Sequence, residues 1–143
     1  MMDVLGHYCD QNKYILHEFV IMPDHLHVLL TPSADISLER AMQLIKGGFS
    51  YRLGPSKEGL VWQESFTNHR SHDEQDYARH AEYIRLNPVR AGLVERPELY
   101  PYSSAAGGKA AVSCRVKRPV FKGGLIARQA LKGDPKDASG TRL

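Results

Sequence analysis

Two histidines separated by a single residue, His25 and His27, are the side chains in this sequence with the clearest capacity for metal chemistry. They begin the run H-L-H-V-L-L-T, whose aliphatic and β-branched residues favour a β-strand. Successive side chains of a strand point to opposite faces, so both imidazoles are expected on one face, with Leu26 and Val28 on the other. Two neighbouring imidazoles on a rigid strand can supply two of the three protein ligands of an open catalytic metal site.

Two other interpretations of the histidine pair stay open at this point. A His-x-His triplet arises by chance, and a histidine on a half-exposed sheet face is commonly a polar surface residue. The histidine-triad nucleotide hydrolases need a third histidine at the next alternate position, which is Leu29 in this sequence. The pattern therefore disfavours that class of hydrolase, and the metal hypothesis needs support from elsewhere in the chain.

A second set of polar side chains shares one face of a predicted helix. The run D-E-Q-D places acidic residues where the positive end of a helix dipole favours them. The helix is expected to run from about Glu74 to Leu86 and to stop at Asn87-Pro88, because a residue before proline resists the helical conformation. Along it, His80, Tyr83 and Asn87 recur at i, i+3 and i+7, which places them on one face.

A tyrosine and an amide one helical turn apart form a candidate catalytic face if this helix packs on the two histidines. A phenol is a poor nucleophile near neutral pH, because its pKa is about 10. It can attack a phosphodiester when a divalent ion polarises the phosphate. The side-chain oxygen of Asn87 would then join His25 and His27 as the third metal ligand. Taken alone, Tyr83 would instead be interpreted as a tyrosine at the edge of the core.

Four further elements are expected to position these side chains. Two strands joined by a turn at Pro23-Asp24 form a hairpin, a helix with one apolar face follows, and a third strand comes next. Their predicted bounds are Tyr14 to Met22, His25 to Thr31, Leu38 to Arg52 and Leu60 to His69.

Basic and imidazole side chains near these elements are candidate phosphate contacts. Lys46 lies on the polar side of the predicted helix, and His69 and Arg70 cluster with His72 just past the third strand. We take Lys46, His69, Arg70 and His80 as the candidate contacts to a nucleic-acid backbone.

The length and composition suit one globular domain. The chain has 143 residues, of which 42% are hydrophobic. No stretch approaches the roughly 18 consecutive apolar residues of a membrane span, and the N-terminus lacks a basic region followed by an apolar run, so we expect a cytoplasmic protein without membrane association. Cys9 and Cys114 show no C-x-x-C spacing and are predicted to be reduced thiols.

The basic charge is concentrated near the C-terminus. Residues 1–102 carry 10 Lys and Arg against 14 Asp and Glu, whereas residues 103–143 carry 9 against 2. The later segment is rich in Gly, Ala and Ser, so we predict a domain over residues 1–104 and a basic, largely disordered tail over 105–143, apart from a candidate short helix at Leu125 to Lys132. Such a tail favours a polyanion through counterion release. A solvated terminus that contacts nothing is the alternative.

Three motifs resemble a known family. They are M-P-D-H-L-H-V-L-L, W-Q-E-S-F-T-N-H and Y-A-R-H-A-E-Y-I-R-L-N-P-V-R-A-G-L-V-E-R-P-E-L-Y-P-Y-S-S. In this order and separation they resemble the IS200-like Y1 transposases of the HUH superfamily, most closely the REP-associated tyrosine transposases. The resemblance covers about residues 4 to 104.

The resemblance implies a fold, an activity and a set of site residues. The fold would be the α+β, ferredoxin-like fold of HUH endonucleases, with an antiparallel sheet and helices on one face. His25, His27 and Asn87 would bind a divalent metal, Mg²⁺ or Mn²⁺, and Tyr83 would be the nucleophile. Family members cut single-stranded DNA near hairpins and form a 5′-phosphotyrosine and a free 3′-hydroxyl.

One departure from the family affects the expected sheet. Members begin with a strand followed by a complete first helix, whereas this chain enters near the end of that helix. The missing strand would be central, so we expect an unpaired edge, which an upstream start or a second chain in a homodimer would fill; a decaying gene copy is the third explanation. A non-catalytic DNA-binding remnant is therefore the alternative function. A phosphohydrolase of small nucleotides would need a walled base pocket that the sequence does not show.

Overall fold

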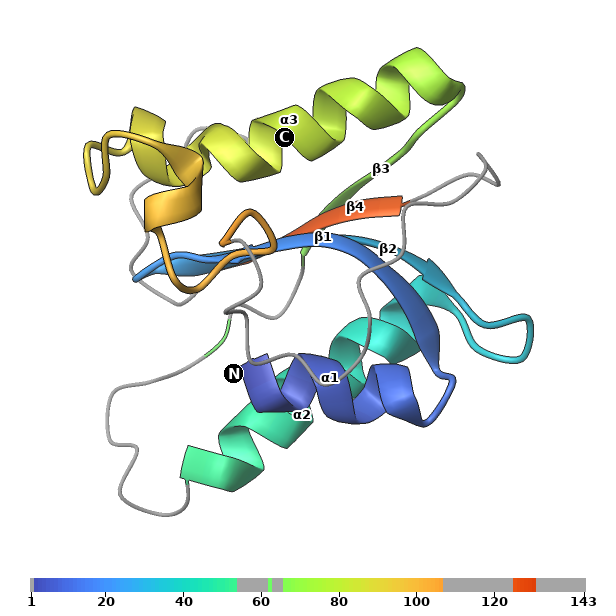
Figure 1. The fold of residues 1–143 in the computed structure, drawn as a ribbon. Helices are drawn as coiled ribbons and strands as arrows, with labels where there is room; N and C mark the ends of the chain where they lie inside the picture. The colour runs from blue at the N-terminus through green and yellow to red at the C-terminus, as the bar shows by residue number, and fades with distance from the viewer. Residues whose placement is uncertain (1, 54–61, 63–65, 107–124, 131–143) are drawn as a thin grey trace.

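A mixed α+β architecture surrounds one four-stranded antiparallel sheet, which confirms the predicted fold class (Figure 1). The computed structural model describes residues 2–53, 62, 66–106 and 125–130. The strands lie in the order β1-β2-β4-β3, and each neighbouring pair is antiparallel. The elements in chain order are α1 (Met2–Asp10), β1 (Tyr14–Ile21), β2 (His25–Pro32), α2 (Leu38–Leu53), β3 (Thr67–Arg70), α3 (Glu74–Arg90), the 3-10 helix η1 (Pro97–Leu99) and β4 (Leu125–Ala130).

Helices cover both faces of the sheet, so the expectation of helices on one face is wrong. In Figure 1, α1 and α2 lie on one side of the sheet and α3 on the other. Leu26 and Val28 belong to the apolar core that includes α1 and α2, whereas Leu29 packs with Ala81 and Ile84 of α3. Strand β2 therefore carries apolar side chains on both of its faces. Each face of the sheet needs helices to cover it.

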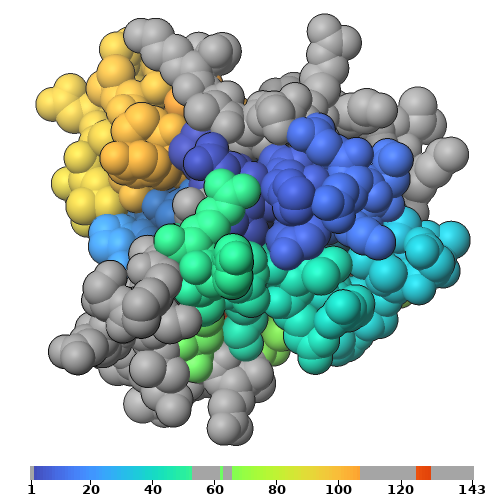
Figure 2. Space-filling model, turned by 90° about the horizontal axis from the view of Figure 1, so that it is seen from below, coloured from blue at the N-terminus to red at the C-terminus, as the bar shows by residue number. Residues whose placement is uncertain are grey.

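The two helices on the lower face pack closely on each other. Figure 2 shows α1 and α2 side by side across the face seen from below. Gly48 of α2 lies at their crossing: a Cβ added there would come within 2.9 Å of Val4 Cγ1 and 3.0 Å of Tyr8 Cε2. The glycine therefore allows a helix contact that a larger residue would widen.

The predicted hairpin is present, with an irregularity that matters for the upper face. The register of β1 against β2 shifts between Leu16 and Glu18. Leu16 packs in the core under α1 and α2, whereas His17 makes an edge-to-face contact with Tyr77 of α3 and Glu18 forms an ion pair with Arg85 of α3. This bulge directs two consecutive polar side chains to the α3 face.

Strand β4 corrects the prediction for the C-terminal segment. Leu125–Ala130 is a strand where the sequence predicts a short helix at Leu125 to Lys132, and it pairs with both β2 and β3. Ile126 faces the α3 side of the core and Ala127 the other side, so pairing and burial override the helical preference of this run. The central position expected to be vacant is thus occupied by the chain itself. Ala106, in the predicted tail, is buried, and the predicted disorder of residues 107–124 and 131–143 lies outside the described residues.

The helix bounds mostly follow the prediction, with one exception. Helix α3 begins at Glu74 with Asp73 as its N-cap, but it continues through Pro88 to Arg90 instead of stopping at Asn87. The proline lacks only its own N–H, and the backbone N–H of Ala91 still donates to the Asn87 carbonyl at 3.0 Å. The third strand covers Thr67–Arg70, and most of its predicted earlier part is outside the described residues.

Two further predictions, on membrane association and on the cysteines, can be compared with the structure. Within the part of the chain that the structure describes, no helix combines the length and apolar character needed to cross a membrane. Cys9 is disulfide-bonded, which contradicts its prediction as a reduced thiol. Spacing along the sequence does not reveal this bond, because pairing depends on which residues the fold brings together.

Candidate active site

His25 and His27 lie side by side on the face of β2 that α3 covers. Their ring centroids are 4.8 Å apart with the planes at 90°. Both are buried, with 4% and 1% of their surface exposed. The alternation of a strand thus brings the two imidazoles together, as predicted from their spacing.

Asp24, in the hairpin turn, orients the first of these rings. Its Oδ1 lies 2.6 Å from Nδ1 of His25. A carboxylate only accepts hydrogen bonds, so Nδ1 carries a proton, and in the neutral ring Nε2 is then the nitrogen with the lone pair. Sequence reasoning assigns Asp24 only to the turn, although a carboxylate beside a candidate ligand histidine is a usable signal.

Helix α3 brings Tyr83 onto the histidine pair. The Tyr83 ring centroid is 5.5 Å from that of His27, with the planes at 87°. The guanidinium carbon of Arg90 lies 5.2 Å from the centre of the same ring. Asn87, one turn after Tyr83, is on the buried side of the helix with 8% of its surface exposed. The helical spacing therefore places the tyrosine and the amide on the face that meets the sheet.

Arg128 of β4 is a buried cation on this face that sequence reasoning missed. It is the cross-strand partner of His27, and 4% of its surface is exposed. Directly opposite residues of an antiparallel pair lie on the same face, with Cβ atoms about 4.5–5.5 Å apart. The Gly, Ala and basic composition of its segment favours a tail, although the alternation of Ile126 and Arg128 with small or polar residues is consistent with a strand.

A buried carboxylate on the neighbouring strand is fully engaged by protein groups. Glu18 is 4% exposed, and its Oε1 lies 3.3 Å from Nε of Arg85. The hydroxyl of Ser104 donates to its other oxygen. Because its charge is compensated within the fold, we assign Glu18 a structural role.

The predicted phosphate contacts separate into two places. Lys46 is on α2, on the opposite face of the sheet from His25 and His27. His69 and Arg70 are exposed on β3, and the ring of His69 lies 4.9 Å from that of His80 on α3. The structure thus brings His69 and His80 together and leaves Lys46 apart.

Polar contacts organise the region around His69 and His80. Ser71 Oγ lies 3.0 Å from Nδ1 of His80, and burial lowers the pKa of the His80 imidazole, which favours its neutral form. The backbone N–H of His72 donates to Oδ2 of Asp76 at 3.2 Å and is the main cause that lowers the pKa of this carboxyl. The sequence predicts Asp76 only as a helix-opening acid, whereas its carboxylate faces the histidines.

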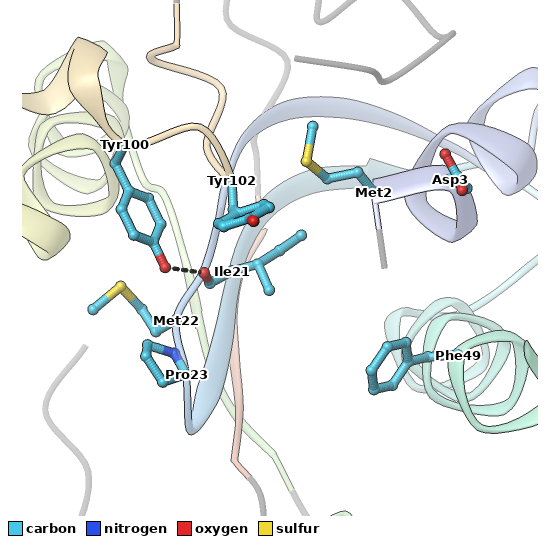
Figure 3. Close-up of a pocket in the computed structure, with 8 residues that line it drawn as sticks. All are labelled: Met2, Asp3, Ile21, Met22, Pro23, Phe49, Tyr100 and Tyr102. Carbon is cyan, nitrogen blue, oxygen red and sulfur yellow. Dashed lines mark hydrogen bonds between the residues drawn. The ribbon is translucent and has the colours of Figure 1, made fainter. Parts of the chain in front are cut away.

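A hollow of about 550 Å³ lies at the end of the hairpin, beside the turn that leads into His25 (Figure 3). The hydroxyl of Tyr100 donates to the carbonyl oxygen of Ile21 at 2.6 Å, and Tyr102 is 54% exposed. The hollow is lined mostly by apolar and aromatic side chains: Met2, Asp3, Ile21, Met22, Pro23, Phe49, Tyr100 and Tyr102.

The first 87 residues, which carry the hairpin and most of α3, match a known protein family. The family is described as "Transposase IS200 like", and its sequence model matches residues 1–87. The chain belongs to the IS200-like transposase family. The resemblance predicted from the three motifs is confirmed.

Curated relatives of this chain are named as REP-associated tyrosine transposases. It is 30% identical over 90 residues to the REP-associated tyrosine transposase of Escherichia coli (strain K12), covering 62% of this chain and 53% of the relative. A protein of Haemophilus influenzae, likewise named after the REP-associated tyrosine transposases, is 31% identical over 108 residues, covering 67% of this chain and 61% of the relative. The chain thus spans between half and two thirds of the length of these relatives.

The fold of this chain is also similar to that of a solved structure. A REP-associated tyrosine transposase bound to a REP hairpin superposes with a TM-score of 0.62 and 24% sequence identity. The match covers 84% of this chain and 76% of the other. This similarity supports the assignment of the fold.

The donor set at the histidine pair fits a divalent metal ion. Two buried imidazoles on one strand supply nitrogen ligands, and Asp24 holds the first of them in the tautomer that a metal requires. Asn87 carries an amide oxygen on the buried side of the facing helix. Imidazole nitrogen with amide, phosphate and water oxygens suits Mn²⁺, and the oxygen ligands suit Mg²⁺.

Proposed function

We propose that this transposase chain nicks and rejoins single-stranded DNA, with Tyr83 as the nucleophile. The observation that carries the proposal is the contact of the Tyr83 ring with His27, beside His25, on one buried face. Membership of the IS200-like transposase family supports the same chemistry.

The reaction would be a transfer of a phosphodiester to the tyrosine. The Tyr83 oxygen forms a bond to phosphorus while the bond from phosphorus to the 3′-oxygen of the preceding nucleotide breaks. The phenol loses one proton and the 3′-oxygen gains one, so the products are a 5′-phosphotyrosine and a 3′-hydroxyl. The reverse reaction with a new 3′-hydroxyl rejoins the strand and restores the phenol.

The chain's own residues hold the reacting groups. A divalent ion, Mg²⁺ or Mn²⁺, held by His25, His27 and Asn87 would polarise the scissile phosphate as a Lewis acid. The buried position of both imidazoles excludes water from their sides, and Asp24 keeps the proton of His25 on Nδ1. Arg90, packed over the Tyr83 ring, limits the orientations of the phenol.

Arg128 would pair with the scissile phosphate. A guanidinium offers paired N–H donors that match phosphate oxygens. Its position opposite His27 puts this cation on the same face as the candidate ligands. Charge that develops on the phosphoryl oxygens during transfer would then meet a fixed positive group.

The proposed substrate is DNA in single-stranded form beside a hairpin. The hollow lined by Phe49, Tyr100 and Tyr102 offers aromatic faces to unstacked bases, which a paired duplex does not present. His80 of α3 is proposed as a contact near the strand's path, and Arg70 of β3 is a second candidate on the side of the sheet that α2 covers, where it lines a hollow with Ser37 and Leu38. A homodimer is not required to complete the sheet, because β4 occupies the central position.

A covalent adduct tests this function. The protein is incubated with Mn²⁺ and a labelled oligonucleotide that carries a hairpin and single-stranded flanks, and denaturing electrophoresis detects protein-bound label. Wild type is expected to form the adduct, and Tyr83→Phe is expected to abolish it with hairpin affinity nearly unchanged, because only a hydroxyl is lost. Tyr51→Phe is the control, since Tyr51 is 87% exposed on α2.

Two outcomes would redirect the assignment. An adduct that survives Tyr83→Phe would place the nucleophile elsewhere. A folded, Mn²⁺-binding wild type that binds the hairpin without forming any adduct would favour the non-catalytic DNA-binding protein.

A further inference from the structure

A second set of metal-ligand side chains lies at the junction of β3 and α3, on residues distinct from the histidine pair of β2. His69 belongs to β3, His72 to the connection, and Asp76 to the first turn of α3. Their ligand atoms, one imidazole nitrogen from each histidine and one carboxylate oxygen, all lie within 4.8 Å of one another. Three ligand groups from three successive parts of the chain therefore converge on one point.

Backbone contacts hold the carboxylate of this group in place. The N–H of His72 donates to Oδ2 of Asp76 at 3.2 Å, and Nε2 of His69 lies 3.8 Å from the same oxygen. The backbone N–H of Asp76 in turn donates to Oδ1 of Asp73, the N-cap of α3, at 2.8 Å. Asp76 is thus oriented by the helix start and the connection before any ligand arrives, which lowers the cost of binding.

The chemistry of the group favours a cation over a phosphate. A carboxylate at its centre repels an anion, whereas two imidazoles with one carboxylate form a ligand set that is common for zinc. His69 and His72 are exposed, so their rings can close the small remaining distance to bond lengths of about 2 Å. Three protein ligands leave a fourth position for water.

We propose that His69, His72 and Asp76 bind one first-row transition-metal cation, with Zn²⁺ as the first candidate. The ion would join the four-residue strand β3 to the start of α3. A ligand that binds the native state alone stabilises it by an amount that rises with the logarithm of the ligand concentration above the dissociation constant, so the junction becomes more stable when zinc is present. This site is independent of the proposed metal at His25 and His27, and the proposal does not rest on the nicking activity.

The test separates the two sites by mutation. Zn²⁺ alone is titrated by calorimetry into protein without a polyhistidine tag, in a His25→Ala/His27→Ala background. We expect one equivalent to remain bound in that background, and we expect His72→Ala or His69→Ala added to it to weaken binding at least about tenfold. Co²⁺ in place of Zn²⁺ reports the coordination through its visible absorption.

Controls exclude a general surface effect. His7→Ala removes another exposed histidine, on α1, and is expected to leave the affinity unchanged. Asp76→Asn should also weaken binding, and thermal unfolding without metal shows whether each variant is folded. Equal Zn²⁺ affinity in the background protein and in its folded His72→Ala derivative would overturn the proposal, as would the absence of any bound zinc in the background protein.

Discussion

At the scale of single residues, the periodicity of strands and helices is enough to locate the candidate site. His25 and His27 share a face because they alternate with Leu26, and Tyr83 and Asn87 share a helical face because they are four residues apart. The same periodicity does not say which face of the sheet each helix covers. For that reason the sequence places Lys46 of α2 and His80 of α3 in one set of candidate phosphate contacts, although the two helices lie on opposite sides of the sheet (Figure 1).

Arg128 supports a prediction at this scale. Arg128→Met removes the charge but keeps an apolar side chain of similar length, so adduct formation is expected to fall about 100-fold, as when a donor to a developing oxyanion is removed. Arg128→Lys should retain part of the rate, because it keeps the charge without the paired donors. The measurement is single-turnover adduct formation with saturating oligonucleotide and Mn²⁺.

The control for this prediction is Arg96→Met. Arg96 is exposed and pairs with Glu98 at 3.6 Å, so the same change there should leave the rate near that of wild type. Thermal unfolding shows whether Arg128→Met is folded, because the loss of a buried charge destabilises a protein when its polar neighbours lose their partner. If folded Arg128→Met formed the adduct at the wild-type rate, the role of Arg128 at the phosphate would be excluded.

At the scale of elements, local sequence signals determine where most helices and strands lie, and tertiary contacts decide the rest. Ser37 caps α2 and Asp73 caps α3, and both residue types are favoured at helix N-termini. Leu125–Ala130 cannot be assigned from local preference, because two neighbouring strands determine its conformation. The extension of α3 past Pro88 likewise depends on backbone N–H groups after the proline. That of Ala91 donates to the carbonyl oxygen of Asn87.

The α1–α2 contact gives a prediction for two adjacent glycines. Gly48→Ala should destabilise the fold by about 1–3 kcal/mol, because the new methyl group would overlap Val4, whose β-branched side chain has little freedom to move. Gly47→Ala should stabilise it by about 0.5–1 kcal/mol, because the position is helical and its Cβ would meet no atom within 4 Å. Urea unfolding of both variants measures the difference. Equal stability of the two variants would contradict the observed helix packing.

At the scale of the whole molecule, the antiparallel α+β fold is predictable from the sequence but its completion is not. The family pattern predicts a vacant central position, and the strand order shows β4 between β2 and β3. The charge of the basic tail, taken alone, predicts that its removal weakens all DNA binding equally. Ile126, fully buried in the core under α3, shows that part of this segment has a structural role.

Truncation tests this role of the C-terminal segment. Removal of residues 125–143 should abolish cooperative thermal unfolding, because β2 and β3 each lose their hydrogen-bonded neighbour and the core loses Ile126. Removal of residues 131–143 leaves every described element intact and should preserve the transition. Circular dichroism melting curves compare the two proteins. Indistinguishable curves would contradict the central position of β4.

The most direct measurement of the proposed chemistry is the identity of the residue attached to DNA. After reaction with Mn²⁺ and the hairpin oligonucleotide, the protein is digested with nuclease and trypsin and analysed by mass spectrometry. Trypsin cleaves after Arg79 and Arg85, which releases the peptide H-A-E-Y-I-R with Tyr83 as its single tyrosine. A phosphonucleotide mass on this tyrosine is the predicted result. The same mass on a different peptide, with this peptide unmodified, would contradict the account.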